Sequence, residues 1–302
     1  MRRLGVLMNV ARDDPAGIAD LAAFRMTLME LGWVEGRNIQ IEVRWPGSDI
    51  ERAEALAKEL VALKPDVLLA RSTPTTAALR REGGATPIVF VNVIEPVEQG
   101  FVQSLARPGG NITGFSNFEP AVAGKWLQLL KEADARIARV ALLHNPQTAP
   151  FAGTFLRSAQ TAAAGFGLAV TAMPVQSDAD IEAAMSAFAR QPGGALVAIP
   201  DSFNAEHRDA IIALAARNRL PALYAVGAST SAGGLMAYAA DTSDLMLRAA
   251  GYIDRILKGA KPGELPVQFP AKFDFAINLR TARALDLQIP QGLLAIADEV
   301  IE

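Results

Sequence analysis

The chain has 302 residues, of which 51% are hydrophobic, and a formal net charge of −3 at pH 7. Its length accommodates two cores of roughly 130–150 residues each, and the near-neutral charge without a basic stripe excludes a typical nucleic-acid-binding surface. There is no cysteine, which excludes disulfides, thiol catalysis and cysteine-ligated metals. No apolar run reaches eighteen residues, so we expect no segment to span a membrane.

Short apolar runs alternate along the chain with amphipathic helical stretches. The first run, Leu4–Val10, is too short and too quickly followed by charge for a signal peptide. It predicts a buried strand, and we expect any export signal to have been removed. Further strands are predicted over Ile39–Val43, Val67–Ala70, Ile88–Val93, Ile112–Phe115, Val140–Leu143, Leu168–Met173, Ala195–Ile199 and Ala222–Tyr224. This alternation predicts an α/β fold with parallel sheets covered by helices on both faces.

Three irregular segments divide these elements into two sets. The Arg107–Asn111 turn ends the first set, Tyr238–Asp241 is a second candidate crossing, and the proline-rich stretch Pro262–Pro270 is a third. The sequence therefore predicts two Rossmann-like lobes that exchange segments through three hinge crossings. We expect the N-terminal lobe to comprise residues 1–115 and about 241–269. The C-terminal lobe would comprise 116–240 and about 270–302, with a ligand cleft between the lobes.

Hydroxyl side chains follow the strand that ends near Ala70. Ser72 and Thr73 come directly after this strand, Pro74 occupies a first-turn position, and Thr75 adds a third hydroxyl. Thr73 is expected to cap the helix, whose free amides and positive dipole end point away from the sheet edge. Such a cradle suits a carboxylate, although plain capping without a ligand is the alternative.

Other strand ends lie at the same kind of edge, where open α/β sheets bind their ligands. Glu95, Asp201 and Asp241 could accept hydrogen bonds from a cationic or hydroxyl group of the ligand. Glu95 and Asp201 could equally be helix caps or surface charges. Tyr224 and its neighbours would cover the apolar body of the ligand. The remaining candidate ligand-binding residues are Met8, Asn9, Val93, Asn145 and Ser202.

Motifs of catalysis and cofactor binding are incomplete. Gly165-Phe166-Gly167 lacks the third glycine of a dinucleotide-binding turn, and Gly227–Ser231 lacks the last glycine of a nucleophile elbow. The only histidines, His144 and His207, have no ligand spacing. We therefore expect no catalytic residue, no metal and no cofactor. Chemistry based on aspartate or lysine alone stays open.

Together, these features and several short stretches make the sequence resemble the family of ABC-transporter substrate-binding proteins that includes tryptophan- and tyrosine-binding members. The most specific stretch is Ser104–Gly114 (SLARPGGNITG). The other stretches that carry the resemblance are Leu31–Asn38, Ala62–Val67, Pro87–Phe90, Leu220–Ala222, Gly233–Tyr238 and Ala297–Ile301.

The resemblance implies a type I periplasmic-binding fold that hinges shut on a small carboxylate-bearing molecule and delivers it to a membrane permease. It places the carboxylate at Ser72–Thr75 and implies a monomer that works in the periplasm or cell envelope. The small residues of Ala225–Ser231 and the lack of a glycine after Tyr238 depart from the family pattern, which leaves the ligand open. The alternatives are a ligand-sensing domain of a regulator, which would need a DNA-binding segment ahead of the first strand, and a two-lobed α/β enzyme.

Overall fold

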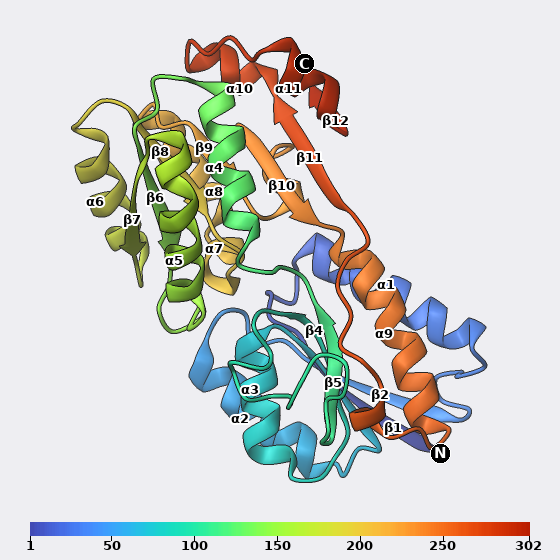
Figure 1. The fold of residues 1–302 in the computed structure, drawn as a ribbon. Coiled ribbons are helices and arrows are strands. Elements are labelled where there is room, and N and C mark those ends of the chain that lie inside the picture. The colour runs from blue at the N-terminus through green and yellow to red at the C-terminus, as the bar shows by residue number, and fades with distance from the viewer. The chain divides into compact units, whose positions relative to one another are not determined.

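The computed structural model describes residues 1–302, which form two compact units. Unit 1 comprises Met1–Glu119 and Asp241–Ala271, and unit 2 comprises Pro120–Ala240 and Lys272–Glu302. The chain thus passes from one unit to the other three times, at 119/120, 240/241 and 271/272. Each unit contains one sheet with helices packed against it (Figure 1).

Unit 1 has a five-stranded sheet in the order β2-β1-β3-β4-β5, in which every neighbouring pair is parallel. Its strands are β1 (Arg2–Leu7), β2 (Ile39–Arg44), β3 (Val67–Arg71), β4 (Ile88–Val93) and β5 (Ile112–Ser116). Its helices are α1 (Pro15–Glu30), α2 (Ile50–Ala62), α3 (Thr73–Gly83) and α9 (Thr242–Leu257), with a short 3-10 turn η3 (Pro262–Glu264). The first strand ends at Leu7, earlier than the sequence predicts, and the Met8 amide makes one further hydrogen bond to the Arg44 carbonyl at 3.0 Å.

The two faces of this sheet bury different side chains. Leu4 and Val6 pack with α1 and α9, whereas Leu7 packs with α2 and α3 on the opposite face. This alternation has the period of two expected of a strand. Both faces are apolar, so the strands read as continuous hydrophobic runs, as in other parallel sheets covered on both sides.

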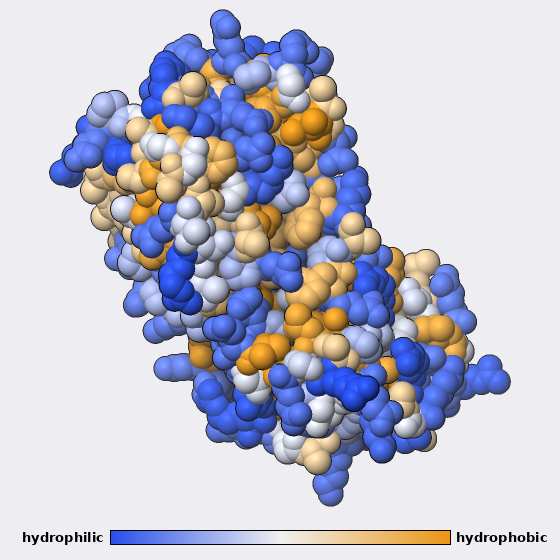
Figure 2. Space-filling model, viewed as in Figure 1, coloured by the Kyte–Doolittle hydropathy of each residue, from blue (hydrophilic) through white to orange (hydrophobic).

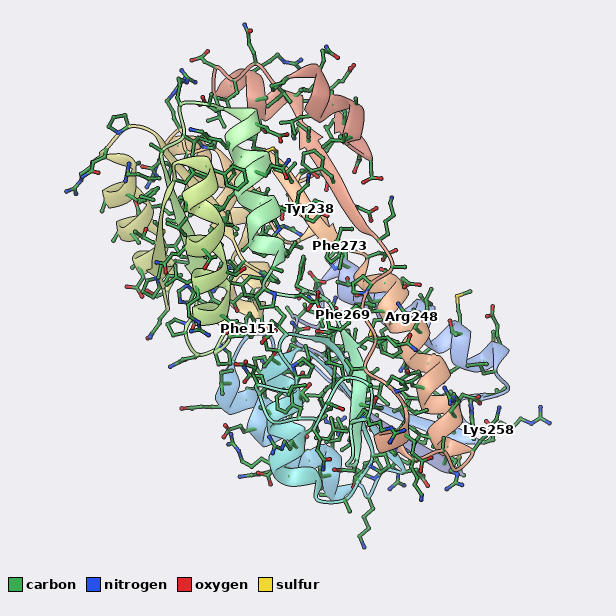
Figure 3. All side chains as sticks on the ribbon, viewed as in Figure 1. Phe151, Tyr238, Arg248, Lys258, Phe269 and Phe273 are labelled. Carbon is green, nitrogen blue, oxygen red and sulfur yellow. The ribbon has the colours of Figure 1, made fainter.

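Unit 2 has a seven-stranded sheet in the order β12-β11-β10-β9-β8-β6-β7. Its strands are β6 (Arg139–His144), β7 (Ala169–Pro174), β8 (Gly194–Ala198), β9 (Ala222–Tyr224), β10 (Met236–Ala240), β11 (Phe273–Asn278) and β12 (Glu299–Ile301). The pairing of β10 with β11 is antiparallel and the other pairings are parallel. The sequence did not predict this antiparallel step, which forms after the chain has passed through unit 1. Tyr238 and Phe273 stack across it at 5.5 Å between ring centroids (Figure 3).

Helices cover both faces of the second sheet as well. α4 (Val122–Ala133) and α5 (Ala152–Ala163) pack against each other through the stacked rings of Trp126 and Phe155. α6 (Asp178–Ala189) and α8 (Arg208–Arg217) bury apolar side chains with the strands in a single cluster. The remaining elements are η1 (Ala164–Phe166), α7 (Ser202–Glu206), η2 (Gly227–Ser229), α10 (Leu279–Ala284) and α11 (Gln291–Ile296).

The segment 265–268 is fastened along β5 before the chain leaves unit 1 for the last time. The Thr113 hydroxyl donates to the carbonyl of Leu265 at 2.6 Å, and the Ser116 amide donates to the carbonyl of Gln268 at 2.9 Å. On α9, Arg248 lies 5.1 Å over the ring of Phe115 and donates to the carbonyl of Phe269 at 3.1 Å (Figure 3). These contacts fix the departing segment to unit 1 as far as residue 269.

The close approach of β4 to β5 explains why the Ser104–Gly114 stretch ends in a glycine. A Cβ atom at Gly114 would overlap the carbonyl oxygen of Phe90 on the neighbouring strand and lie 2.6 Å from its amide nitrogen. Because both atoms belong to the backbone of a buried strand, neither can move aside. Gly110, four residues earlier, has open space where a side chain would stand.

We predict that Gly114→Ala lowers the free energy of unfolding by more than about 2 kcal/mol, since it forces the neighbouring strands β4 and β5 apart. Gly110→Ala is the matched control and should change stability by less than about 0.5 kcal/mol. Urea unfolding followed by circular dichroism measures both. Equal stability of the two variants would contradict the close approach of β4 and β5.

Candidate functional site

The amino terminus of α3 is the centre of the candidate site in unit 1. Ser72 is the N-cap residue, and its hydroxyl accepts from the Thr75 amide at 3.3 Å and lies 3.0 Å from the Thr75 hydroxyl. The sequence placed the cap at Thr73, which is instead the first helical residue. The backbone of Ser72 is not helical, with φ 155° and ψ 170°, so the helix begins at Thr73 and Pro74 lies in its first turn. All three hydroxyl side chains are buried.

The turn that follows β4 is joined to this helix. The hydroxyl of Thr73 accepts a hydrogen bond from the Ile94 amide at 3.3 Å. Asn92, at the register shift near the end of β4, and Glu95, in the turn, have φ angles of 60° and 54°, a left-handed conformation that is uncommon for residues other than glycine and is often found at functional sites. Val93 is buried between them, whereas the Glu95 side chain is half-buried.

The end of β1 supplies two predicted residues of different character. Met8 is fully buried in the apolar cluster beneath α1 and α9. Asn9 is also buried, and its side-chain oxygen accepts from the Arg71 guanidinium at 2.8 Å. Met8 therefore supports the site from within the core, while Asn9 belongs to a polar network.

The centre of that network is a buried ion pair that sequence analysis missed. The Arg71 guanidinium, at the end of β3, donates to the carboxylate of Asp20 on α1 at 2.7 Å, and the two side chains are only 10% and 4% exposed. The other oxygen of Asp20 accepts from the Ser243 hydroxyl on α9 at 2.7 Å. The Nε of Arg71 is buried without a hydrogen-bond partner in the protein. Four elements of unit 1 are thus tied together one residue away from Ser72.

Asp241 occupies the start of α9. Its exposed carboxylate caps the helix by accepting from the amides of Ser243 at 3.0 Å and Asp244 at 3.1 Å. The sequence pattern predicted a ligand contact at Asp241 and did not predict this cap.

In unit 2, Asp201 forms the centre of the corresponding sheet edge after β8. Its carboxylate accepts from the Asn145 amide at 2.8 Å, the Phe203 amide at 3.0 Å and the Thr148 hydroxyl. Burial raises the pKa of this carboxyl, and the three hydrogen bonds oppose the rise. The side chain also caps α7, whose first residue is the buried Ser202.

Tyr224, at the end of β9, is buried in the same unit. Burial raises the pKa of its phenol above the ordinary value. A Cβ atom at Gly234 would meet the Tyr224 ring at 2.8 Å, so the glycine leaves room for the ring. In the small-residue segment that follows, Ser229 and Thr230 are buried as well.

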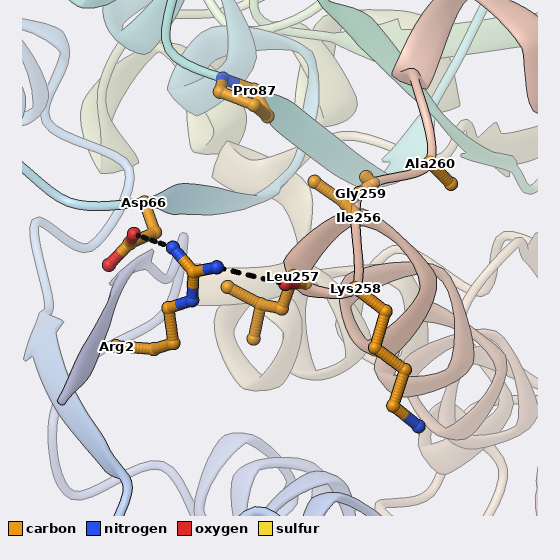
Figure 4. Close-up of a pocket in the computed structure, with 8 residues that line it drawn as sticks. All are labelled: Arg2, Asp66, Pro87, Ile256, Leu257, Lys258, Gly259 and Ala260. Carbon is orange, nitrogen blue, oxygen red and sulfur yellow. Dashed lines mark hydrogen bonds and ion pairs between the residues drawn. The ribbon is translucent and has the colours of Figure 1, made fainter.

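A pocket of about 260 Å³ lies elsewhere in unit 1, at the amino ends of the strands (Figure 4). It is lined by Arg2, Asp66 and Pro87 and by residues 256–260. Arg2 joins Asp66 at 2.7 Å and the Leu257 carbonyl at 3.4 Å across it. None of the predicted site residues lines this pocket.

Two classes of feature are absent from residues 1–302. No group of three or more histidine, cysteine, aspartate or glutamate side chains could hold a metal ion. No helix is both long enough and apolar enough to cross a bilayer.

Two parallel-sheet lobes flanked by helices define the architecture of periplasmic binding proteins, and the sequence agrees. The family model described as ABC transporter substrate binding protein matches residues 6–301. The chain belongs to this family.

Relatives and solved structures extend the comparison. The chain is 25% identical over 265 residues to a tyrosine-binding protein of Clostridioides difficile, covering 88% of this chain and 76% of the relative. A conserved domain protein from Vibrio cholerae has a TM-score of 0.90 at 27% identity, with 99% of each chain covered. An ABC domain from Streptococcus pneumonia in complex with L-Trp has a TM-score of 0.88 at 24% identity, again with 99% of each chain covered.

We predict that Arg71→Met destabilises unit 1 by about 3 kcal/mol, because it leaves the Asp20 carboxylate buried without its cation. Arg217→Met is the matched control. Arg217 pairs with Glu182 at 2.6 Å, but both side chains are more than half exposed, so its loss should cost less than about 1 kcal/mol. Chemical denaturation measures both variants, and equal losses would contradict the structural role of the buried pair.

Proposed function

We propose that the chain is the solute-binding component of an ABC importer and captures a small carboxylate-bearing molecule, an aromatic amino acid or a related organic acid. The observation that carries the proposal is the α3 amino terminus, where three hydroxyl side chains and a positive helix dipole lie at the carboxyl edge of a parallel sheet. The relative that binds tyrosine and the neighbour in complex with L-Trp support this class of ligand.

We assign the ligand carboxylate to Ser72, Thr73 and Thr75, with Pro74 shaping the first turn of α3. The ammonium is assigned to Glu95, because its half-buried carboxylate lies at the end of the neighbouring strand. Asp201 is a weaker candidate, since three protein donors already occupy its oxygens.

The second wall of the site is proposed to come from the carboxyl edge of the sheet in unit 2, through Asn145, Ser202 and Tyr224. Closure of the two units over the solute would be driven by contacts made only in the closed state. The three chain crossings would serve as the hinge, which is consistent with the fastening of residues 265–269 to unit 1.

The proposal includes release of the ligand unchanged to a membrane permease, outside the cytoplasmic membrane. The chain has two histidines and no cysteine, which supports binding rather than catalysis. Detection of a product by mass spectrometry after incubation with the bound solute would refute this part of the proposal.

We predict that tyrosine or tryptophan raises the melting temperature of the chain and that the corresponding amides, which lack the carboxylate, do not. Ser72→Ala should weaken ligand affinity about tenfold, because one hydrogen bond to a charged group is lost. Titration of the ligand in a thermal-shift assay measures this. A ligand-induced shift that survives both Ser72→Ala and Thr73→Val would overturn the assignment of the carboxylate.

The matched control for Ser72→Ala is Ser177→Ala. Ser177 caps α6 in unit 2 by accepting from the Asp180 amide at 3.2 Å, so its removal costs a helix cap of the same kind, about 1 kcal/mol. It should lower the melting temperature in the absence of ligand and leave the ligand-induced shift unchanged.

A further inference from the structure

The outward face of α1 is mainly apolar, with the exposed Arg25 and Glu30 as its charged residues. Ile18, Met26 and Met29 expose 49%, 59% and 55% of their surface, and Pro15, Ala19 and Ala22 on the same face are also exposed. Leu31 and Val34 continue the apolar surface beyond the helix. Of the ten large hydrophobic side chains exposed on the chain, five lie between residues 18 and 34.

This pattern is unusual for a surface helix, which normally turns charged residues to solvent. The inward face of α1 is apolar as well, since Leu21, Phe24 and Leu28 are buried in the core of unit 1. Figure 2 shows hydrophobic surface among hydrophilic residues in the region of α1, at the right of the view. We name the exposed set Ile18, Ala22, Met26, Met29, Leu31 and Val34 the α1 patch.

We propose that the α1 patch is a docking surface for the permease of the transporter to which this solute-binding chain belongs. The proposal rests on the proposed function, because a solute-binding component must meet its permease and leave again. Methionine suits such a contact: its flexible, polarisable side chain adapts to a partner without a fixed fit.

The size of the patch favours a transient partner over a stable second copy. Five large side chains that each expose about half of their surface provide on the order of 500 Å². A stable complex buries about 800 Å² on each partner, so this surface is too small for a permanent dimer on its own.

The charges around the patch do not favour a lipid surface. Arg12, Arg25 and Arg37 are balanced by Asp13, Glu30 and Glu35, and Arg25 lies 3.5 Å from Glu35 in an ion pair. Binding to an anionic membrane requires an excess of basic residues, and a protein partner does not.

The same helix also reaches the candidate solute site. Its inward-facing Asp20 holds Arg71, one residue before Ser72, and accepts from Ser243 at the start of α9. A partner on the outer face of α1 would therefore contact an element that is fixed to the solute-binding edge of unit 1.

The test is ligand-stimulated ATP hydrolysis by the transporter's own permease and ATPase subunits in proteoliposomes. Met26→Glu should raise the concentration of binding protein that gives half-maximal stimulation at least tenfold, because it places a charge in an apolar contact. Ile296→Glu is the matched control, since Ile296 is 53% exposed on α11 of unit 2, and it should leave stimulation unchanged. Stimulation by Met26→Glu equal to that of the unsubstituted chain would overturn the proposal.

Thermal shift separates this inference from the proposed function. Met26→Glu should keep the full shift with tyrosine or tryptophan, whereas failure of the unsubstituted chain to bind any carboxylate solute would refute the proposed function itself. Sedimentation showing a dimer that Met26→Glu abolishes, or binding to vesicles of anionic phospholipid that it abolishes, would assign the patch to another partner and overturn the inference.

Because the chain contains no cysteine, a single introduced thiol gives a direct second measurement. M26C carrying a benzophenone maleimide should cross-link to the permease on illumination, and I296C should not. Equal cross-linking by both variants would contradict docking through α1.

Discussion

All five strands of the first sheet run parallel, so their carboxyl ends and the amino ends of the helices that follow them meet at one edge. The rest of unit 1 depends on this constraint. It brings Asn9, Arg71 and Glu95, from three different strand ends, to the same edge, where a helix dipole adds positive potential.

Burying charged groups at the end of a hydrophobic sheet costs free energy unless the charges are paired. The Asp20 carboxylate pairs with Arg71 and accepts from Ser243, and these contacts join α1, β3 and α9. In unit 2, Asp201 has the equivalent structural role and is satisfied by Asn145, Phe203 and Thr148. Buried hydrogen bonds therefore hold each edge where the proposed function requires preorganised donors and acceptors.

Periodicity and turn residues predicted most strands, because runs such as Val67–Ala70 are buried on both faces. The helix cap was predicted one residue late, since Ser72 and Thr73 can both cap and only the backbone angles distinguish them. The pairing of Arg71 with Asp20 could not be predicted, because it joins residues 51 positions apart. Local sequence likewise could not show that protein donors occupy the Asp201 carboxylate. The assignment of individual residues to the ligand stays a prediction.

The central claim is that two units close over a carboxylate-bearing solute, and small-angle X-ray scattering tests it most directly. The chain is measured without ligand and at saturation with the amino acid that gives the largest thermal shift. The account predicts a smaller radius of gyration at saturation, with one solute bound per chain. An unchanged radius of gyration with the solute demonstrably bound would contradict closure.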